Sequence, residues 1–475
     1  MKSLERLLLP ILVVTPVLVL GLFPLAPRPA RLTAAWQRAY ISETFGMPAE
    51  AARYYRQVLE YQPERTDLFE RIAGLEFSGG EYLKAIGSYN TAMEFAEISA
   101  GGLLNLGDAY LQTGDSAKAS ETWRKLASLA AVNANQMALA ADRLRAAGDL
   151  DGTLLAAQRW LELEPESVQA AWLTGMLLSV RSIADAARPL ASAGNGEGAE
   201  AEKSRRLLEV LGQAALQNDR AYQLVLIGQR LGDLGQWDVA ETTFRAALNL
   251  APEYAEAWAF LGESRQQLGK EGWTDLLRAK DLAPNSDIVL SALTLYWSRR
   301  NKPMVALTYL QKLAANHPDQ GRWQVEIGST FAQAGDLVSA MAAYQRAVEI
   351  EPINAQFWRA LAVFSATYGF DFAVFSLPAI ERALILASKD LQVLDAAGWV
   401  YLTHGDLEKA EQFLQLALAE DGEFEAAQFH LAQVYIAGNR FSLAFPLLKT
   451  AAAQNADPAV ASQAQRLLDK HFPGQ

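Results

Sequence analysis

The feature that most constrains the fold of this chain is a repeat of 34 residues that runs from about residue 32 to residue 458. Prolines mark the repeat: Pro252, Pro284, Pro318 and Pro352 follow one another at steps of 32, 34 and 34 residues. When such a proline is placed at position 32 of the unit, units begin at residues 32, 66, 100, 134, 168, 221, 255, 287, 321, 355, 391 and 425. A period of this length is typical of a solenoid, in which each unit buries its apolar face against its neighbours.

Two columns of small residues run through the units. Position 8 is Gly or Ala in eleven of the twelve units, and position 20 is Ala in nine of the ten units that keep the register. Large side chains such as Trp123 and Phe244 recur at position 24. Because two helices approach closely only where side chains are small, the pattern predicts an antiparallel helix pair in each unit, with the large side chains filling the gaps.

The residues between the two predicted helices carry turn signals. Glycine can adopt the left-handed backbone that ends a helix, and an aspartate after it can cap the next helix. Glycines stand at this point at Gly80, Gly114, Gly148, Gly235, Gly335 and Gly405, and four of them are followed by Asp115, Asp149, Asp336 and Asp406. We therefore predict an all-α fold, an α-solenoid of about twelve helix-turn-helix units.

These columns resemble the tetratricopeptide repeat family. The best matches are Leu224, Gly228, Leu231, Ala240, Phe244, Ala247 and Pro252 in one unit, and Ile327, Gly328, Phe331, Ala340, Tyr344, Ala347 and Pro352 in another. The resemblance covers about residues 32–458. It implies a right-handed superhelix in which the first helices line a concave groove and positions 2, 5, 9, 12 and 13 point into it.

Departures from the repeat divide the chain. The unit at 168 loses the repeat pattern before the glycine-rich Gly194–Gly198. A further helix over about residues 200–217 precedes the next unit that matches the pattern. The expected divisions are an N-terminal array at 32–192, a flexible loop and extra helix at 193–220, a C-terminal array at 221–458 and a capping helix at 459–475.

Four further irregularities lie within the units. The unit at 355 is two residues longer than the others, around Ala366–Phe375. Pro189, Pro378 and Pro446 fall midway along predicted second helices. Because proline removes a helical hydrogen bond, we expect these three helices to bend or to start late.

The N-terminus differs from the rest of the chain. Leu7–Ala26 contains no charge over 20 residues, and a helix of this length spans about 30 Å, the thickness of the bilayer hydrocarbon. We predict that residues 1–30 form a transmembrane anchor with a basic flank. A cleaved signal peptide is the alternative, and its one tolerable cleavage pattern is Thr33-Ala34-Ala35.

The positive charges on the two sides of this anchor are nearly equal in number. Basic residues precede the apolar stretch at Lys2 and Arg6 and follow it at Arg28, Arg31 and Arg38. The positive-inside rule therefore does not decide between the two orientations. A short basic start followed by an apolar run is the usual shape of a signal anchor, which favours a single-pass protein of the cell membrane whose repeats face the extracytoplasmic side.

Composition excludes several kinds of chemistry. The chain has no cysteine, so it contains no disulfide, thiolate metal site or cysteine nucleophile. A net charge of −12 and a pI near 5.1 argue against a nucleic-acid partner, which requires a basic surface. The four histidines show no metal-binding spacing, and no phosphate-binding loop is present. The sequence indicates neither a metal nor another cofactor.

The resemblance implies which side chains face the groove. The candidate partner-binding residues are Trp36, Tyr40, Glu70, Phe77, Asp108, Asp142, Trp172, Tyr222, Arg322, Arg359, Trp399 and Phe429. Acids outnumber bases among the groove positions of the first array, which favours a basic or amphipathic partner segment. Some family members clamp a C-terminal carboxylate with Lys at position 5 and Asn at position 9, and no unit here has that pair.

We therefore predict a membrane-anchored, non-enzymatic scaffold that presents its groove to partner proteins or peptides within an envelope-assembly, secretion or other membrane complex. The alternative is a carbohydrate-binding array, or a carbohydrate-active enzyme that uses groove aromatics and carboxylates such as Asp108. The sequence leaves the oligomeric state open.

Overall fold

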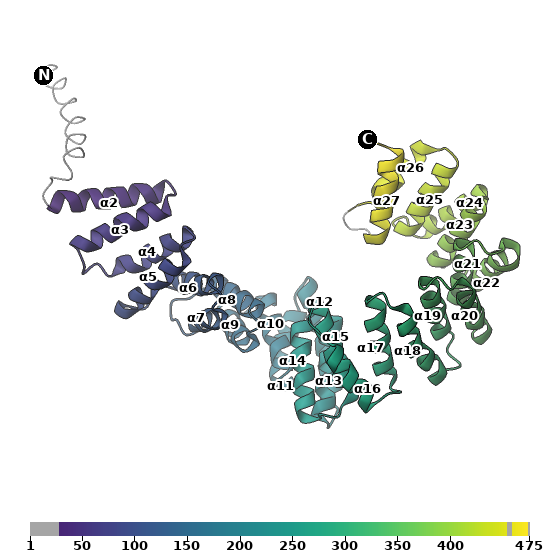
Figure 1. Cartoon of the computed structure of the whole chain (residues 1–475), viewed down its shortest axis with the longest axis horizontal. Helices are drawn as coiled ribbons and strands as arrows, with labels where there is room; N and C mark the ends of the chain where they lie inside the picture. Colours follow the sequence, from purple (N-terminus) through teal and green to yellow (C-terminus); the bar gives the residue numbers. More distant parts are fainter. Residues whose placement is uncertain (1–27, 454–457, 474–475) are drawn as a thin grey trace, which may run out of the picture. The chain divides into compact units, whose positions relative to one another are not determined.

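The computed structural model describes residues 28–453 and 458–473, and in these residues helices joined by turns and short loops are the regular structure, with no strand (Figure 1). Within them, 26 α-helices form twelve antiparallel pairs and two additional helices. The predicted all-α class and the predicted number of units are confirmed. The right-handed superhelix stays a prediction.

The chain divides into two compact units, and the first ends at Pro252. The first helices of its six pairs are α2 (Arg28–Thr44), α4 (Asp67–Ser78), α6 (Ala100–Gln112), α8 (Ala134–Ala146), α10 (Val168–Ser179) and α13 (Arg220–Asp233). The second helices are α3 (Pro48–Tyr61), α5 (Tyr82–Phe95), α7 (Ser116–Leu126), α9 (Leu150–Leu163), α11 (Ile183–Gly194) and α14 (Trp237–Leu250). The additional helix α12 (Ala199–Ala215) lies between α11 and α13 in the sequence.

The second unit begins at Glu253 and also contains six pairs. The first helices are α15 (Ala255–Gln267), α17 (Asp287–Arg299), α19 (Arg322–Gln333), α21 (Ala355–Thr367), α23 (Leu391–His404) and α25 (Glu425–Ala437). The second helices are α16 (Trp273–Leu282), α18 (Pro303–Asn316), α20 (Leu337–Ile350), α22 (Leu377–Leu386), α24 (Leu407–Glu420) and α26 (Phe441–Ala451). The additional helix α27 (Pro458–His471) follows.

The small residues at position 8 allow the two helices of a pair to come together. In several pairs the side chain at position 24 of the second helix lies directly against the glycine of the first. A Cβ added to Gly228 would lie 2.6 Å from Phe244 Cε1, and one added to Gly328 would lie 2.9 Å from the ring of Tyr344. The column of glycines is therefore a packing requirement of the fold.

The turn signals are also confirmed. All six predicted turn glycines have a positive φ, between 74° and 88°. Asn301 and Asn439 take the same backbone conformation, with φ of 53° and 57°, in two pairs that lack the glycine. The four predicted aspartate caps, Asp115, Asp149, Asp336 and Asp406, each accept a hydrogen bond from the backbone N–H three residues further on.

The additional helix α12 connects the repeats on either side of it. It packs against α10 and α11 before it and against α13 after it. The loop that precedes it is short, and Arg205 Nη1 on α12 donates to the carbonyl oxygen of Gly194 at 2.7 Å. The two compact units divide after Pro252, one helix pair beyond α12. The expected division into two arrays on either side of residues 193–220 stays a prediction.

The three interrupting prolines behave in two ways. Pro189 lies inside α11 and Pro446 lies inside α26, and both helices continue through them. Pro378 instead lies in the first turn of α22, which starts late, after a single π-helical turn, η2 (Phe372–Ser376). The two extra residues of this unit are accommodated here.

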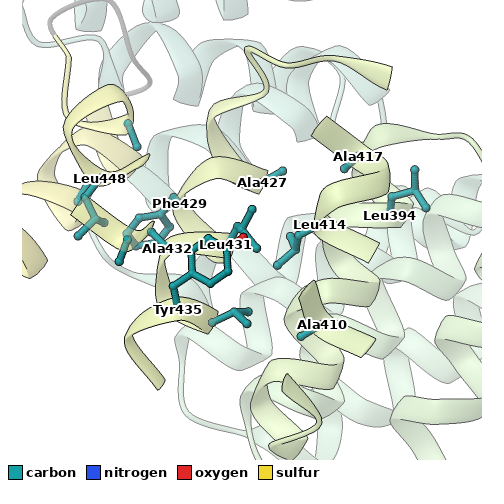
Figure 2. Close-up of a cluster of buried hydrophobic side chains, with 14 of the residues drawn as sticks. Leu394, Ala410, Leu414, Ala417, Ala427, Phe429, Leu431, Ala432, Tyr435 and Leu448 are labelled. Carbon is teal, nitrogen blue, oxygen red and sulfur yellow. The ribbon is translucent and has the colours of Figure 1, made fainter. Parts of the chain in front are cut away.

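The predicted capping helix is present as α27, which packs on α25 and α26. It buries Ala464 and places Leu467 and Leu468 against the last hydrophobic cluster of the second unit. Figure 2 shows this cluster, in which Phe429, Tyr435 and Leu414 gather between the helices.

The predicted membrane anchor, Leu7–Ala26, lies outside the described residues. Among the helices that the structure describes, none is both long enough and apolar enough to cross a bilayer. The anchor thus stays a prediction. The last three residues of the predicted segment 1–30 belong to α2, which begins at Arg28.

Replacing Gly107 by alanine tests the packing requirement. A Cβ at this position would overlap the buried indole of Trp123, with Cε2 only 2.7 Å away. We expect Gly107→Ala to lower the free energy of unfolding by about 1–3 kcal/mol, the usual cost of overpacking.

The matched control is Gly87→Ala on α5, where an added Cβ meets no atom within 4 Å. Because alanine favours helix, this control should be neutral or stabilising by up to about 1 kcal/mol. Thermal and urea unfolding of both variants measure the difference, and equal destabilisation would contradict the packing argument.

Candidate functional site

A hollow of about 650 Å³ opens on the first-helix side of the first three pairs, and we call it the first-helix pocket. It lies along α2, α4 and α6, and one side chain from α5 reaches it. The residues that line it are Trp36, Arg65, Asp67, Leu68, Glu70, Arg71, Gly74, Tyr89, Ser99, Gly101, Gly102 and Asn105. Two of the predicted partner-binding residues, Trp36 and Glu70, are therefore brought together here.

Glycines form part of the pocket lining. A Cβ added to Gly102 would lie 2.6 Å from Glu70 Oε1, so glycine at this position leaves room for the carboxylate of Glu70 where it now lies. Cβ atoms added to Gly74 and Gly101 would meet only single atoms, at 3.6 and 3.7 Å. The pocket is open because these positions carry no side chain, and a ligand can approach the helix backbone there.

Trp36 is half-buried and forms one wall of the pocket. The guanidinium carbon of Arg65 lies 5.0 Å from the centre of the Trp36 ring, a cation–π distance. The ring packs edge-on against Tyr55 at 5.7 Å, and its Nε1 donates to Gln62 Oε1 at 3.5 Å. These contacts fix the orientation of the indole, which is a property of aromatic anchors in binding sites.

The carboxylates near the pocket already have partners. Arg65 donates two hydrogen bonds to Asp67, at 2.8 and 2.7 Å, and this hydrogen bonding lowers the pKa of Asp67 below its ordinary value. Glu43 accepts from Arg71 at 2.8 Å, and Glu70 accepts from the backbone N–H of Ser99 at 2.9 Å. In this region Asp67 and Glu43 are therefore paired with arginines outside the counted groove positions, and Glu70 is hydrogen-bonded to a backbone N–H.

Two neutral polar groups complete the pocket. Asn105 Nδ2 donates to Tyr89 Oη at 3.3 Å. Burial raises the pKa of Tyr89 to about 12, so its hydroxyl keeps its proton at neutral pH. The pocket thus offers one aromatic wall, paired charges and neutral hydrogen-bonding groups.

The other predicted residues of the first unit lie outside this pocket. Tyr40 is 65% exposed, Tyr222 is 39% exposed and Asp142 is exposed. Phe77 is half-buried and packs edge-on against Tyr82 at 5.6 Å.

Two predicted residues of the first unit make contacts within the protein that leave little of them available to a partner. Asp108 accepts two hydrogen bonds from Arg143, at 2.5 and 2.7 Å. Trp172 is only 5% exposed, because α10 is buried along most of its length. Its ring packs in the core and presents almost no face to a ligand.

In the second unit, α21, α23 and α25 bring Trp399 into a row with neighbouring polar groups. Trp399 is half-buried, its Nε1 donates to Thr367 Oγ1 at 3.1 Å, and its ring centre lies 5.1 Å from that of His430. His430 Nδ1 in turn lies 2.7 Å from Asp395 Oδ1. The sequence did not predict this row, because its side chains come from three different helix pairs.

The remaining predicted residues of the second unit are dispersed. Arg359 donates to Gln356 Oε1 at 2.6 Å, and Arg322 lies 4.4 Å from the ring of Trp323. Phe429 is 5% exposed and belongs to the core cluster of Figure 2. As with Trp172, a position that should face the groove is turned inward by the local packing.

Sequence reasoning missed several pocket residues. Arg65 lies in the turn between two pairs, and Tyr89 sits at a position assigned to packing. Asn105 follows the expected groove position by one residue. The usable signal was the set of glycines Gly74, Gly101 and Gly102, which leaves one stretch of the first helices without side chains.

An ion pair joins α8 to the start of α14, although α9 to α13 separate these two helices in the sequence. Arg145 donates to Asp238 at 2.7 and 2.8 Å, and to Gln236 Oε1 at 2.8 Å. Burial alone would raise the pKa of Asp238, but the hydrogen bond and charge of Arg145 lower it. Arg145 is therefore part of a contact that stabilises the fold.

Within residues 28–453 and 458–473, no group of three or more histidine, aspartate or glutamate side chains is placed to hold a metal ion.

Comparison with protein families agrees with the helix pairs. Models described as tetratricopeptide repeat match residues 44–102, 225–270 and 294–356, residues 401–468, and residues 100–133, which together are more than half of the chain. The chain belongs to the tetratricopeptide repeat family. The unmatched stretches include the segment around α12 and the pair that contains η2, where the repeat departs from its usual length.

The solved structures that match this chain have low sequence identity to it. Yeast Tom70 is 15% identical, with 94% of this chain and 96% of that chain covered and a TM-score of 0.42. A tetratricopeptide repeat protein from Parabacteroides merdae is 15% identical over 52% of this chain and 98% of that one, with a TM-score of 0.43. PilW, a type IV pilus biogenesis factor, is 17% identical over 45% and 98%, with a TM-score of 0.38. Curated protein sequences give no match.

Proteins of this family generally mediate protein–protein interactions and are typically not enzymes. The carbohydrate alternative is not favoured. Trp123 and Trp172 are buried and offer no stacking face, and the carboxylate of Asp108 is held by Arg143.

The Arg145–Asp238 pair gives a prediction about pH. Because the folded-state pKa of Asp238 is lowered, its stabilising effect is present above the ordinary aspartate pKa of about 3.9 and is lost as the pH falls through the folded value. We expect Asp238→Asn to cost about 1–2 kcal/mol near neutral pH, since both partners are partly buried, and much less in acid. The thermal midpoint of the two proteins as a function of pH measures this. A deficit that is the same at all pH values would contradict the ion-pair explanation.

Proposed function

We propose that this chain is a membrane-anchored, non-catalytic scaffold whose first-helix pocket holds a segment of a partner protein. The partner segment is amphipathic, with one large apolar side chain placed against Trp36 and polar groups placed against Tyr89 and Asn105. A strongly basic segment fits less well, because Asp67 and Glu70 are already hydrogen-bonded.

The observation that carries this proposal is the pocket itself. A half-buried, fixed tryptophan beside a glycine-lined helix surface is the arrangement that binding hot spots use, since a rigid aromatic side chain loses little entropy on binding. The glycines allow a peptide to approach the helices closely, and the neutral hydrogen-bonding groups orient it.

The membrane part of the proposal rests on the sequence of Leu7–Ala26. The geometry of α2 supports an uncleaved anchor over a cleaved signal. Ala34 and Ala35, within the one tolerable cleavage pattern, are 6% and 2% exposed in α2. Cleavage there would remove the part of α2 that packs in the first core.

We further propose that the array faces the extracytoplasmic side of the cell membrane and works within an envelope-assembly, secretion or other membrane complex. The short basic start before the apolar stretch supports this orientation.

Filling the pocket should abolish partner binding without unfolding the protein. In Gly74→Gln the new side chain would extend into the pocket, since only Tyr89 Oη lies near the added Cβ. We expect the partner that co-purifies from detergent-solubilised membranes to bind at least about tenfold more weakly, the effect of losing an anchor worth about 1.4–2 kcal/mol.

The matched control for this experiment is Gly87→Gln, the same substitution on the exposed face of α5 outside the pocket. It should retain the partner. Equal retention by both variants, with both folded, would contradict a binding role for the pocket.

The anchor and its orientation are tested separately by protease treatment of spheroplasts. The proposal predicts that the chain stays with the membrane after washing at high salt and alkaline pH, and that added protease digests the repeats in intact spheroplasts. Release of the chain by washing would contradict the anchor, and protection from protease would contradict the orientation.

A further inference from the structure

The first helix of the array, α2, carries a row of exposed side chains that are uncharged, while its described charged residues Arg31, Arg38 and Glu43 are half-buried. The exposed side chains described on α2 are Thr33, Gln37, Tyr40, Ile41 and Thr44, and Phe45 and Met47 follow in the turn. Tyr40, Ile41, Phe45 and Met47 are 65%, 49%, 75% and 40% exposed, and we call these four residues the N-terminal apolar edge. Large apolar side chains gathered in this way on a surface usually mark an interaction site.

The last described helix, α27, has a polar outer face. Its apolar residues Leu467 and Leu468 pack inward, and its exposed side chains include Gln463, Arg466 and Lys470. Terminal helices of repeat arrays need a polar outer face for solubility. The exposed face of α27 carries charged side chains, whereas the exposed side chains described on α2 are uncharged and four large apolar ones lie at its C-terminal end, so the two ends of the array differ in surface chemistry.

The sequence beside α2 indicates the environment of the N-terminal end. The helix begins at Arg28, directly after the uncharged Leu7–Ala26 and Pro27. At about 1.5 Å per residue, the 17 residues of α2 extend about 25 Å from the end of the proposed anchor. The inference below therefore rests on the proposed anchor, which would hold the start of α2 at the bilayer surface.

We propose that α2 lies along the membrane surface and that the N-terminal apolar edge enters the boundary between lipid headgroups and acyl chains. Aromatic rings such as those of Tyr40 and Phe45 are favoured at this boundary, and an apolar helix face buries there. The carboxylate of α2, Glu43, does not oppose anionic headgroups, because it accepts hydrogen bonds from Arg71 and Tyr55 at 2.8 Å each. The anchor and the edge together hold the first pair of helices against the bilayer.

The absence of native cysteine allows a direct test in the full-length chain. An environment-sensitive fluorophore is attached to Ile41→Cys, and to Val338→Cys as the matched control. Val338 is also an exposed aliphatic residue, 77% exposed, but lies on α20 in the second unit. Both proteins are reconstituted into vesicles of phosphatidylcholine and phosphatidylglycerol, with and without lipids brominated near the headgroup, and flotation is measured in parallel.

The proposal predicts that the label at position 41 shifts to shorter wavelength in vesicles and is quenched by brominated lipid several-fold more strongly than the label at position 338. Equal, weak quenching of the two labels in chains that float would overturn the lipid contact and leave the anchor intact. A label at position 41 that is shielded from a water-soluble quencher but not quenched by brominated lipid would also overturn it, because protein would then cover the edge. Failure of the chain to float would contradict the anchor itself, and with it this inference.

Discussion

The close packing of two helices across a column of small residues is the interaction on which the rest of this structure depends. In several pairs the first helix lies against its partner where a glycine admits a large side chain, as Gly228 admits Phe244 and Gly107 admits Trp123. The repeated pair then leaves one face of the first helices free of this packing. The pocket forms on that face, so the site is a consequence of the same spacing that creates the core.

Much of the fold follows from residues whose effects are local. A turn glycine requires a left-handed backbone, and an aspartate after it caps the next helix within a few residues. Asp115 and Gly114 show this directly. The extra helix and the late start of α22 were also predictable, since loss of the period and the position of Pro378 are visible in the sequence.

The site was only partly predictable, because it depends on contacts between residues distant in the sequence. Counting acids at groove positions suggested a negative surface, but Arg71 from the next repeat pairs with Glu43, and Arg143 pairs with Asp108. Trp172 shows the same limit, since the packing around α10 turned an expected groove residue into a core residue.

The central claim is that the first-helix pocket is the surface that contacts a partner protein, and photocrosslinking in intact cells tests it most directly. A photoreactive amino acid is placed at Gly101, which lines the pocket, and in a second strain at Gly87, an open position on α5. The account predicts a discrete adduct with a second protein from position 101 and none from position 87. Adducts of the same size and yield from both positions, or none from position 101 in a chain that retains its fold, would contradict it.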